Sequence, residues 1–109
     1  MPKIFFLDHP VGSVIGRAKI NNYFSFSGRC TVGNNKGIYP IIGKKVLMSN
    51  GSSIIGNCIV GNNVIFAANS SIVDMDIPNN SIVYGQFPNN VIKKIPSGKF
   101  SKIIKGWLF

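Results

Sequence analysis

The chain has 109 residues, the size of a single domain, and a formal net charge of +9. Alanine and leucine are scarce and glutamate is absent, so the composition disfavours helices and favours strands broken by tight turns. Two cysteines are too few for a disulfide framework, and we find no signal peptide and no apolar run of the roughly 18 residues that span a membrane, so the expected compartment is the cytoplasm.

The main feature of the sequence is a period of six in its apolar residues, which starts near the N-terminus and is interrupted twice. The residue after each apolar position is usually small or asparagine, which suits a turn. A period of six is neither helical nor a simple strand alternation, and it predicts a solenoid with three short strands per coil. The apolar positions are Ile20, Phe26 and Val32, followed by Ile42, Met48, Ile54, Val60, Phe66 and Ile72.

In such a solenoid each group of six residues forms one face of a triangular prism, and every third group stacks on the same face. We therefore expect three inward-facing apolar ladders: Ile20–Ile42–Val60, Phe26–Met48–Phe66 and Val32–Ile54–Ile72. Cys30 and Cys58 occupy equivalent positions four groups apart, which places them on different faces and predicts two thiols rather than a disulfide.

Two interruptions mark candidate functional loops. The first adds two residues between Leu7 and Ile15, around His9, and the second adds four residues within the segment 34–41. Solenoid insertions project as loops on one face and often build a site, although loop drift without function is the alternative interpretation.

The regular pattern ends after Ile72, and a last strand is expected at 81–84. We divide the chain into a solenoid over residues 1–92, with a loop insertion at 34–41, and a basic C-terminal tail over 93–109. The tail carries five lysines and no acid, which suits a solvated surface and a phosphate contact equally well. Trp107 and its apolar neighbours are expected to pack on the prism.

From Leu7 to Lys94 the sequence resembles the hexapeptide-repeat acyltransferases, in particular the serine acetyltransferases and the sugar O-acetyltransferases of surface-polysaccharide pathways. The matching pieces are Leu7-Asp8-His9 with Val14-Ile15-Gly16, the six-residue repeats from Ile42 to Ile72, and the closing Asp76-Ile77-Pro78 and Val83-Tyr84-Gly85-Gln86-Phe87-Pro88. The resemblance implies an all-β, left-handed parallel β-helix that assembles as a homotrimer and binds acetyl-CoA between neighbouring prisms.

The same resemblance implies roles for individual residues. His9 becomes the general base that takes the proton of an attacking hydroxyl, and Asp8 helps to orient the site. The positions implied for acetyl-CoA are Gly33, Asn34, Asn50, Ala68 and Gly85, with Lys93 and Lys94 near the CoA phosphates, and Tyr39 lies in the implied substrate loop.

The sequence departs from serine acetyltransferases at the loop, where Ile38-Tyr39 stands in place of an Arg-His pair, and Asn89 and Asn90 stand where an arginine is common. Those enzymes also carry an aspartate one coil before the histidine and a preceding helical domain, whereas eight residues precede His9 here.

These features leave three function classes open: an acetyl-CoA-dependent O-acetyltransferase acting on serine or a sugar, a non-catalytic solenoid that binds a partner, and a nucleic-acid binder. Arg17 and Arg29 are the only arginines and lie away from the tail, so we expect no nucleic acid. One histidine, three aspartates and two separated cysteines give no metal-ligand spacing, so we expect no metal.

Overall fold

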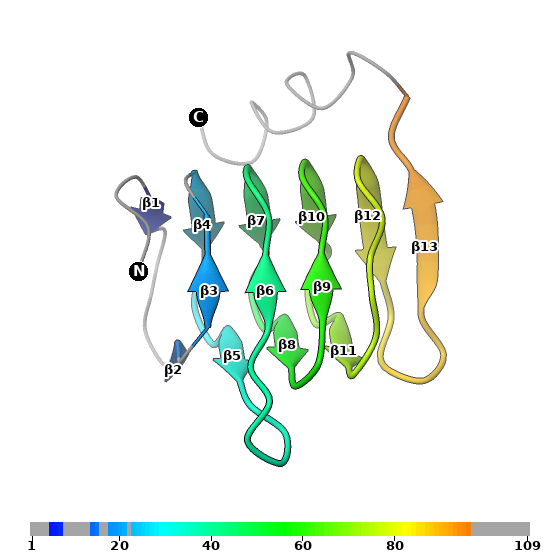
Figure 1. Ribbon diagram of the computed structural model, residues 1–109. Helices are drawn as coiled ribbons and strands as arrows, with labels where there is room; N and C mark the ends of the chain where they lie inside the picture. The colour runs from blue at the N-terminus through cyan, green and yellow to red at the C-terminus, as the bar shows by residue number, and fades with distance from the viewer. Residues whose placement is uncertain (1–4, 8–13, 16–17, 22, 97–109) are drawn as a thin grey trace.

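The computed structural model describes residues 5–7, 14–15, 18–21 and 23–96, and within them every regular element is a β-strand (Figure 1). The strands are short, because each six-residue repeat contains both a strand and a turn. They are β1 (Phe5–Leu7), β2 (Val14–Ile15), β3 (Lys19–Ile20), β4 (Phe24–Phe26), β5 (Thr31–Gly33), β6 (Ile41–Ile42), β7 (Val46–Met48), β8 (Ser53–Ile55), β9 (Ile59–Val60), β10 (Val64–Phe66), β11 (Ser71–Val73), β12 (Ser81–Tyr84) and β13 (Val91–Lys94).

The strands form three sheets that wrap around one core as a prism of about four coils. The six-stranded sheet has the order β1-β4-β7-β10-β12-β13, the four-stranded sheet β11-β8-β5-β2, and the three-stranded sheet β3-β6-β9. Every pair is parallel except β12 with β13. From β1 to β8, each strand pairs with the third strand that follows it in the chain, as a solenoid with three strands per coil requires. The predicted left-handed parallel β-helix is therefore confirmed.

The three predicted ladders are confirmed residue by residue. Ile42 pairs with Ile20 and Val60, Met48 with Phe26 and Phe66, and Ile54 with Val32 and Ile72. All of these side chains are buried except Ile20, which packs on the edge of the core. Burying one such side chain contributes roughly 1.5–3 kcal/mol, as an upper estimate, so these ladders contribute strongly to the stability of the fold.

Three corners join the sheets, and we number them in the order in which the chain passes through them. The first corner leads from the six- to the four-stranded sheet (27–30, 49–52, 67–70), the second from the four- to the three-stranded sheet (34–40, 56–58, 74–76), and the third back to the six-stranded sheet (43–45, 61–63, 78–80). Left-handed backbone recurs at equivalent corner positions, because a tight turn between short strands needs it. Asparagine and glycine fill many of these positions, since they adopt a positive φ at low cost.

The third corner is packed so closely that a methyl group does not fit at Gly43. A Cβ atom there would lie 2.6 Å from the carbonyl oxygen of Gly61 and 2.5 Å from Oδ1 of Asn62, an atom that accepts the Lys44 N–H at 2.7 Å. Gly43→Ala should therefore lower the free energy of unfolding by about 1–3 kcal/mol, because backbone must shift to admit the methyl group.

Urea unfolding at fixed protein concentration measures this change, and Gly33→Ala is the matched control. A Cβ atom at Gly33 meets only Cδ1 of Ile55, at an ordinary 3.7 Å. Equal midpoints for the two variants would contradict the assignment of close packing to the third corner.

The two cysteines lie at different corners, as predicted. Cys30 is buried in the first corner and Cys58 in the second, and no disulfide joins them. The described residues contain no helix that could span a membrane.

The C-terminal end of the described chain is a hairpin rather than another coil. β13 runs antiparallel to β12, and the solenoid–tail boundary set at residue 92 falls within this strand (Figure 1). Ile95, just beyond β13, packs with Leu47 and Ile65 on the outer face of the six-stranded sheet. The division into solenoid and tail stays a prediction, and Trp107 lies outside the described residues.

Candidate functional site

The first corner is a stack of tight turns. In successive coils the N–H of Ser52 donates to the carbonyl of Ser49 at 3.1 Å, and the N–H of Ser70 donates to that of Ala67 at 3.1 Å. The third residue of each turn, Gly51 or Asn69, has a positive φ of 77° or 60°, as type II turns require.

These turns are also joined to one another along the solenoid axis. The Asn69 N–H donates to the carbonyl of Asn50 at 2.9 Å, and the Gly51 N–H donates to that of Gly28 at 3.0 Å. The second residues of the turns, Asn50 and Ala68, are exposed, and their N–H groups have no hydrogen-bond partner among the described residues. The first corner thus presents a short row of exposed donors that suits a ligand with carbonyl groups.

Gly85 lies at the same corner as Asn50 and Ala68, in the last coil. Its carbonyl accepts the N–H of Ser71 at 3.0 Å and the Asn90 side-chain amide at 3.0 Å, and its φ of 78° turns the chain out of β12 into the hairpin. The structure therefore brings Asn50, Ala68 and Gly85 together along one corner.

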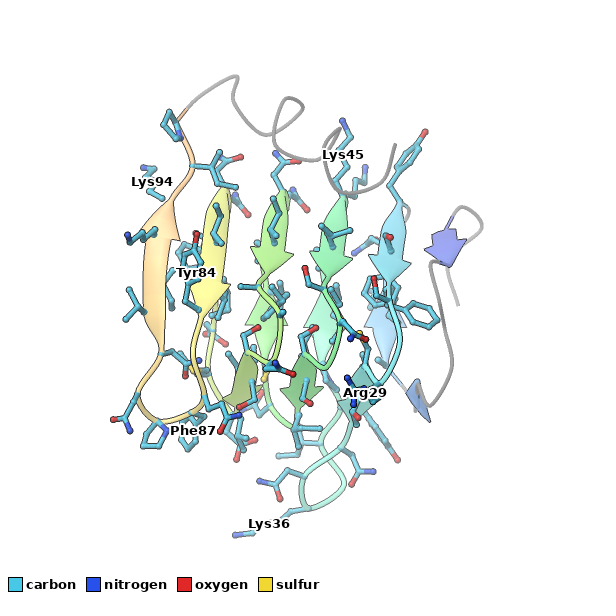
Figure 2. The ribbon with its side chains drawn as sticks, turned by 180° about the vertical axis from the view of Figure 1, so that it is seen from behind. Arg29, Lys36, Lys45, Tyr84, Phe87 and Lys94 are labelled. Carbon is cyan, nitrogen blue, oxygen red and sulfur yellow. The ribbon has the colours of Figure 1, made fainter. Side chains whose placement is uncertain are left out.

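The two candidate phosphate-binding lysines are placed differently from each other. Lys93 Nζ lies 5.9 Å from the centre of the Tyr84 ring, and Tyr84 directly precedes Gly85. Lys94 pairs with Ser81 at the far end of the hairpin, and Figure 2 shows it at the same end of the molecule as Lys45, away from Phe87. Lys93 is therefore the lysine nearer to the first corner.

Gly33, Asn34 and Tyr39 lie at the second corner, on the other side of the four-stranded sheet from Asn50 and Ala68. Gly33 accepts the Gly56 N–H at 2.9 Å, and Oδ1 of Asn34 accepts the Gly37 N–H at 3.3 Å. Strands of three residues separate the two corners by about 10 Å. The candidate acetyl-CoA residues thus form two groups in a single chain.

The connection between β5 and β6, which we name the 34–40 loop, projects away from the prism (Figure 1). It is a small hairpin in which Asn35 and Ile38 exchange two backbone hydrogen bonds, both of 3.1 Å. Lys36 lies at the tip of the loop (Figure 2). Tyr39 follows the hairpin and is partly exposed.

His9 and Asp8 lie outside the described residues. The strands on either side of them in the sequence, β1 and β2, belong to the six-stranded and the four-stranded sheet.

Other reactive groups in the described part of the chain offer little chemistry. Burial raises the pKa of the Cys58 thiol, and the nearby Asp74 carboxylate acts in the same direction, which keeps the sulfur protonated. No group of three or more histidine, cysteine, aspartate or glutamate side chains comes together there to hold a metal ion.

Sequence reasoning missed a contact at the second corner, between Asn35 in the 34–40 loop and Asp74. Nδ2 of Asn35 donates to Oδ2 of Asp74 at 2.7 Å, across 39 residues of sequence. The available signal was that Asp74 follows Gly56 by eighteen residues, which is three groups of six and places both at one corner.

Comparison with known proteins gives structural matches alone, since no family model and no curated protein sequence matches the chain. Serine acetyltransferase from Neisseria gonorrhoeae superposes with a TM-score of 0.75 and 27% identity, over 90% of this chain and 40% of that one. The enzyme from Brucella abortus strain S19 gives 0.73 and 31%, over 84% and 37%. A serine acetyltransferase in complex with CoA gives 0.70 and 26%, over 84% and 39%. The chain spans about two fifths of the length of these enzymes.

Proposed function

From the premise that this chain has the hexapeptide-repeat solenoid of the serine acetyltransferases that it resembles, we propose that it is an acetyl-CoA-dependent O-acetyltransferase. The acceptor is a hydroxyl group of serine or of a sugar in surface-polysaccharide synthesis. The observation that carries the proposal is the superposition on serine acetyltransferases at 27% and 31% identity over most of this chain.

In the proposed reaction the acceptor hydroxyl attacks the thioester carbonyl carbon of acetyl-CoA. The hydroxyl proton passes to the imidazole of His9, the carbon–sulfur bond breaks, and the CoA thiolate leaves and takes up a proton. An imidazole suits this role because its pKa is ordinarily near neutrality, and His9 is the only histidine in the sequence. Asp8 is proposed to help orient the site.

The first corner supports the cofactor part of this proposal. The pantetheine arm of CoA is a chain with two amide groups, and the exposed N–H groups of Asn50 and Ala68 can donate to its carbonyl oxygens. One of the similar structures is a complex with CoA. Gly33 ends β5 and Asn34 begins the second corner, and in the proposed assembly they meet the cofactor from a neighbouring subunit.

A thiol-release assay with acetyl-CoA, run against a panel of sugars and against serine, tests the function. We expect acceptor-dependent release of CoA, and a thermal shift of the protein on adding acetyl-CoA. If acetyl-CoA at millimolar concentration neither binds nor is consumed, the chain is instead a solenoid that binds a partner without catalysis.

Removing both hairpin lysines should weaken CoA binding. In the double variant Lys93→Ala with Lys94→Ala we expect the dissociation constant to rise by roughly tenfold, because two cations near the CoA phosphates are lost. The rate with bound cofactor should change less. Calorimetry at two salt concentrations measures the effect, since salt screens such contacts.

The matched control removes the same charge from the third corner, as Lys44→Ala with Lys45→Ala. Both lysines are exposed there. An equal loss of CoA affinity in both double variants would assign the effect to net charge alone.

We further propose that the chain assembles as a homotrimer. Support comes from isoleucines on the outer face of the three-stranded sheet, where Ile41 pairs with Ile59 and the two side chains are 43% and 52% exposed. Light scattering at micromolar concentration should give three times the chain mass of 11.9 kDa. A monomer at that concentration would argue against a site built between subunits.

A further inference from the structure

The Asp74 side chain joins two parts of the second corner. Oδ1 of Asp74 accepts the N–H of Asn57 at 2.8 Å, and Oδ2 accepts the Asn35 side-chain amide at 2.7 Å. Asn57 belongs to the solenoid, and Asn35 belongs to the 34–40 loop. A single carboxylate thus holds the loop against the next two coils, through hydrogen bonds that its charge strengthens.

The backbone around Asp74 is built for this contact. Asp74 itself has a φ of 50°, a left-handed conformation that aspartate adopts more easily than most residues. Gly56 lies opposite it, where a Cβ atom would collide with the carboxylate and come within 2.7 Å of Cβ of Asn35. Glycine at 56 therefore leaves the space in which the loop, the coil and the carboxylate meet.

The contact reaches Tyr39 through the loop backbone. Asn35 is paired with Ile38 by two hydrogen bonds across the turn at Lys36, and Ile38 directly precedes Tyr39. On the other side of Tyr39, Pro40 is buried and its carbonyl accepts the Lys19 N–H at 3.0 Å. Pro40 is thus fixed to the coil by its hydrogen bond with Lys19, and Ile38 is fixed through Asn35, which Asp74 holds.

We propose that Asp74 is a positioning residue, whose carboxylate holds the 34–40 loop against the solenoid and thereby sets the position of Tyr39 for the acceptor. The part that concerns the acceptor rests on the proposed acetyltransferase function, in which Tyr39 belongs to the substrate loop. The part that concerns the loop does not.

Limited trypsin digestion tests the loop directly, because the bond between Lys36 and Gly37 lies at its tip (Figure 2). In Asp74→Ala and in Asn35→Ala we expect cleavage of this bond to be faster by about fivefold, the effect of losing one hydrogen bond to a charged group at a partly solvated site. The double variant should be cleaved no faster than Asp74→Ala alone, because the contact that Asn35→Ala removes is already lost when the carboxylate is gone.

Asp76→Ala is the matched control. Oδ1 of Asp76 accepts the Ile59 N–H at 3.1 Å, in the same corner but within the coil, so its loss should leave cleavage at Lys36 unchanged. Asp74→Asn should restore slow cleavage, because an amide at 74 can still accept from Asn57 and pair with a rotated Asn35 amide. Cleavage at the parental rate in both Asp74→Ala and Asn35→Ala would overturn the proposal.

Steady-state kinetics at saturating acetyl-CoA test the role of Tyr39. In Asp74→Ala the KM for the acceptor should rise by about fivefold, with a smaller change in kcat and unchanged CoA affinity, and Asp74→Asn should recover most of the loss. A loosened loop with a parental KM would overturn the positioning role. If the parent protein transfers no acetyl group, the proposed function fails, and the digestion still decides whether Asp74 holds the loop.

Discussion

Replacing His9 with alanine should lower the rate of acetyl transfer by about 10²–10⁴-fold and leave CoA binding nearly unchanged. The acceptor hydroxyl must lose its proton as it attacks the thioester, and His9 is the only imidazole in the sequence. No other side chain has an ordinary pKa that suits a base at neutral pH. Single-turnover measurement of thiol release separates this chemical step from cofactor binding.

The control for His9→Ala is calorimetry with CoA, which should give the parental dissociation constant. A variant that transfers acetyl groups as fast as the parent would remove His9 from the mechanism.

Met48→Asp should prevent stable folding. Met48 is fully buried between Phe26 and Phe66 in the longest sheet, so a carboxylate there has no water and no partner. We expect a loss of about 4 kcal/mol or more, a large part of the 5–15 kcal/mol that typically holds a domain together. Circular dichroism and urea unfolding measure the outcome.

Two controls separate burial of charge from the substitution itself. Met48→Leu keeps the volume and should cost less than about 1.5 kcal/mol. Asn50→Asp introduces the same carboxylate two residues later, at an exposed position, and should change stability by less than about 0.5 kcal/mol. A folded Met48→Asp variant with the midpoint of Asn50→Asp would contradict the inward direction of this ladder.

Much of the fold could be predicted from the sequence because each coil repeats one physical requirement. An apolar residue every sixth position must face the core, so the neighbours of Met48 and Ile54 follow from counting. The loop at 34–40 also follows, since extra residues cannot enter a coil without disturbing the stack above and below it.

The C-terminal hairpin and the contacts of the 34–40 loop could not be predicted, because they do not follow the period of six. β13 reverses direction after the regular pattern has ended. The period of six therefore does not predict which residues of β12 lie beside Lys93 and Lys94. The bond between Asn35 and Asp74 depends on how far the loop folds back, which a sequence of asparagines and glycines leaves open. The sequence predicts no single acceptor for the same reason, because the 34–40 loop that we propose to contact it does not follow the period of six.

The reversal at β13 also bears on how the molecule behaves at high concentration. A parallel solenoid can in principle grow without limit, since the top of one coil is a template for the bottom of another chain, and stacked molecules would become a fibre. The hairpin interrupts that route, because β13 extends only the six-stranded sheet, while the four-stranded sheet ends at β11 and the three-stranded sheet at β9. Lys93 and Lys94 also bring two like charges to this edge. An approaching second copy would therefore meet three faces that end at different heights, together with electrostatic repulsion, and could not continue the stack in register.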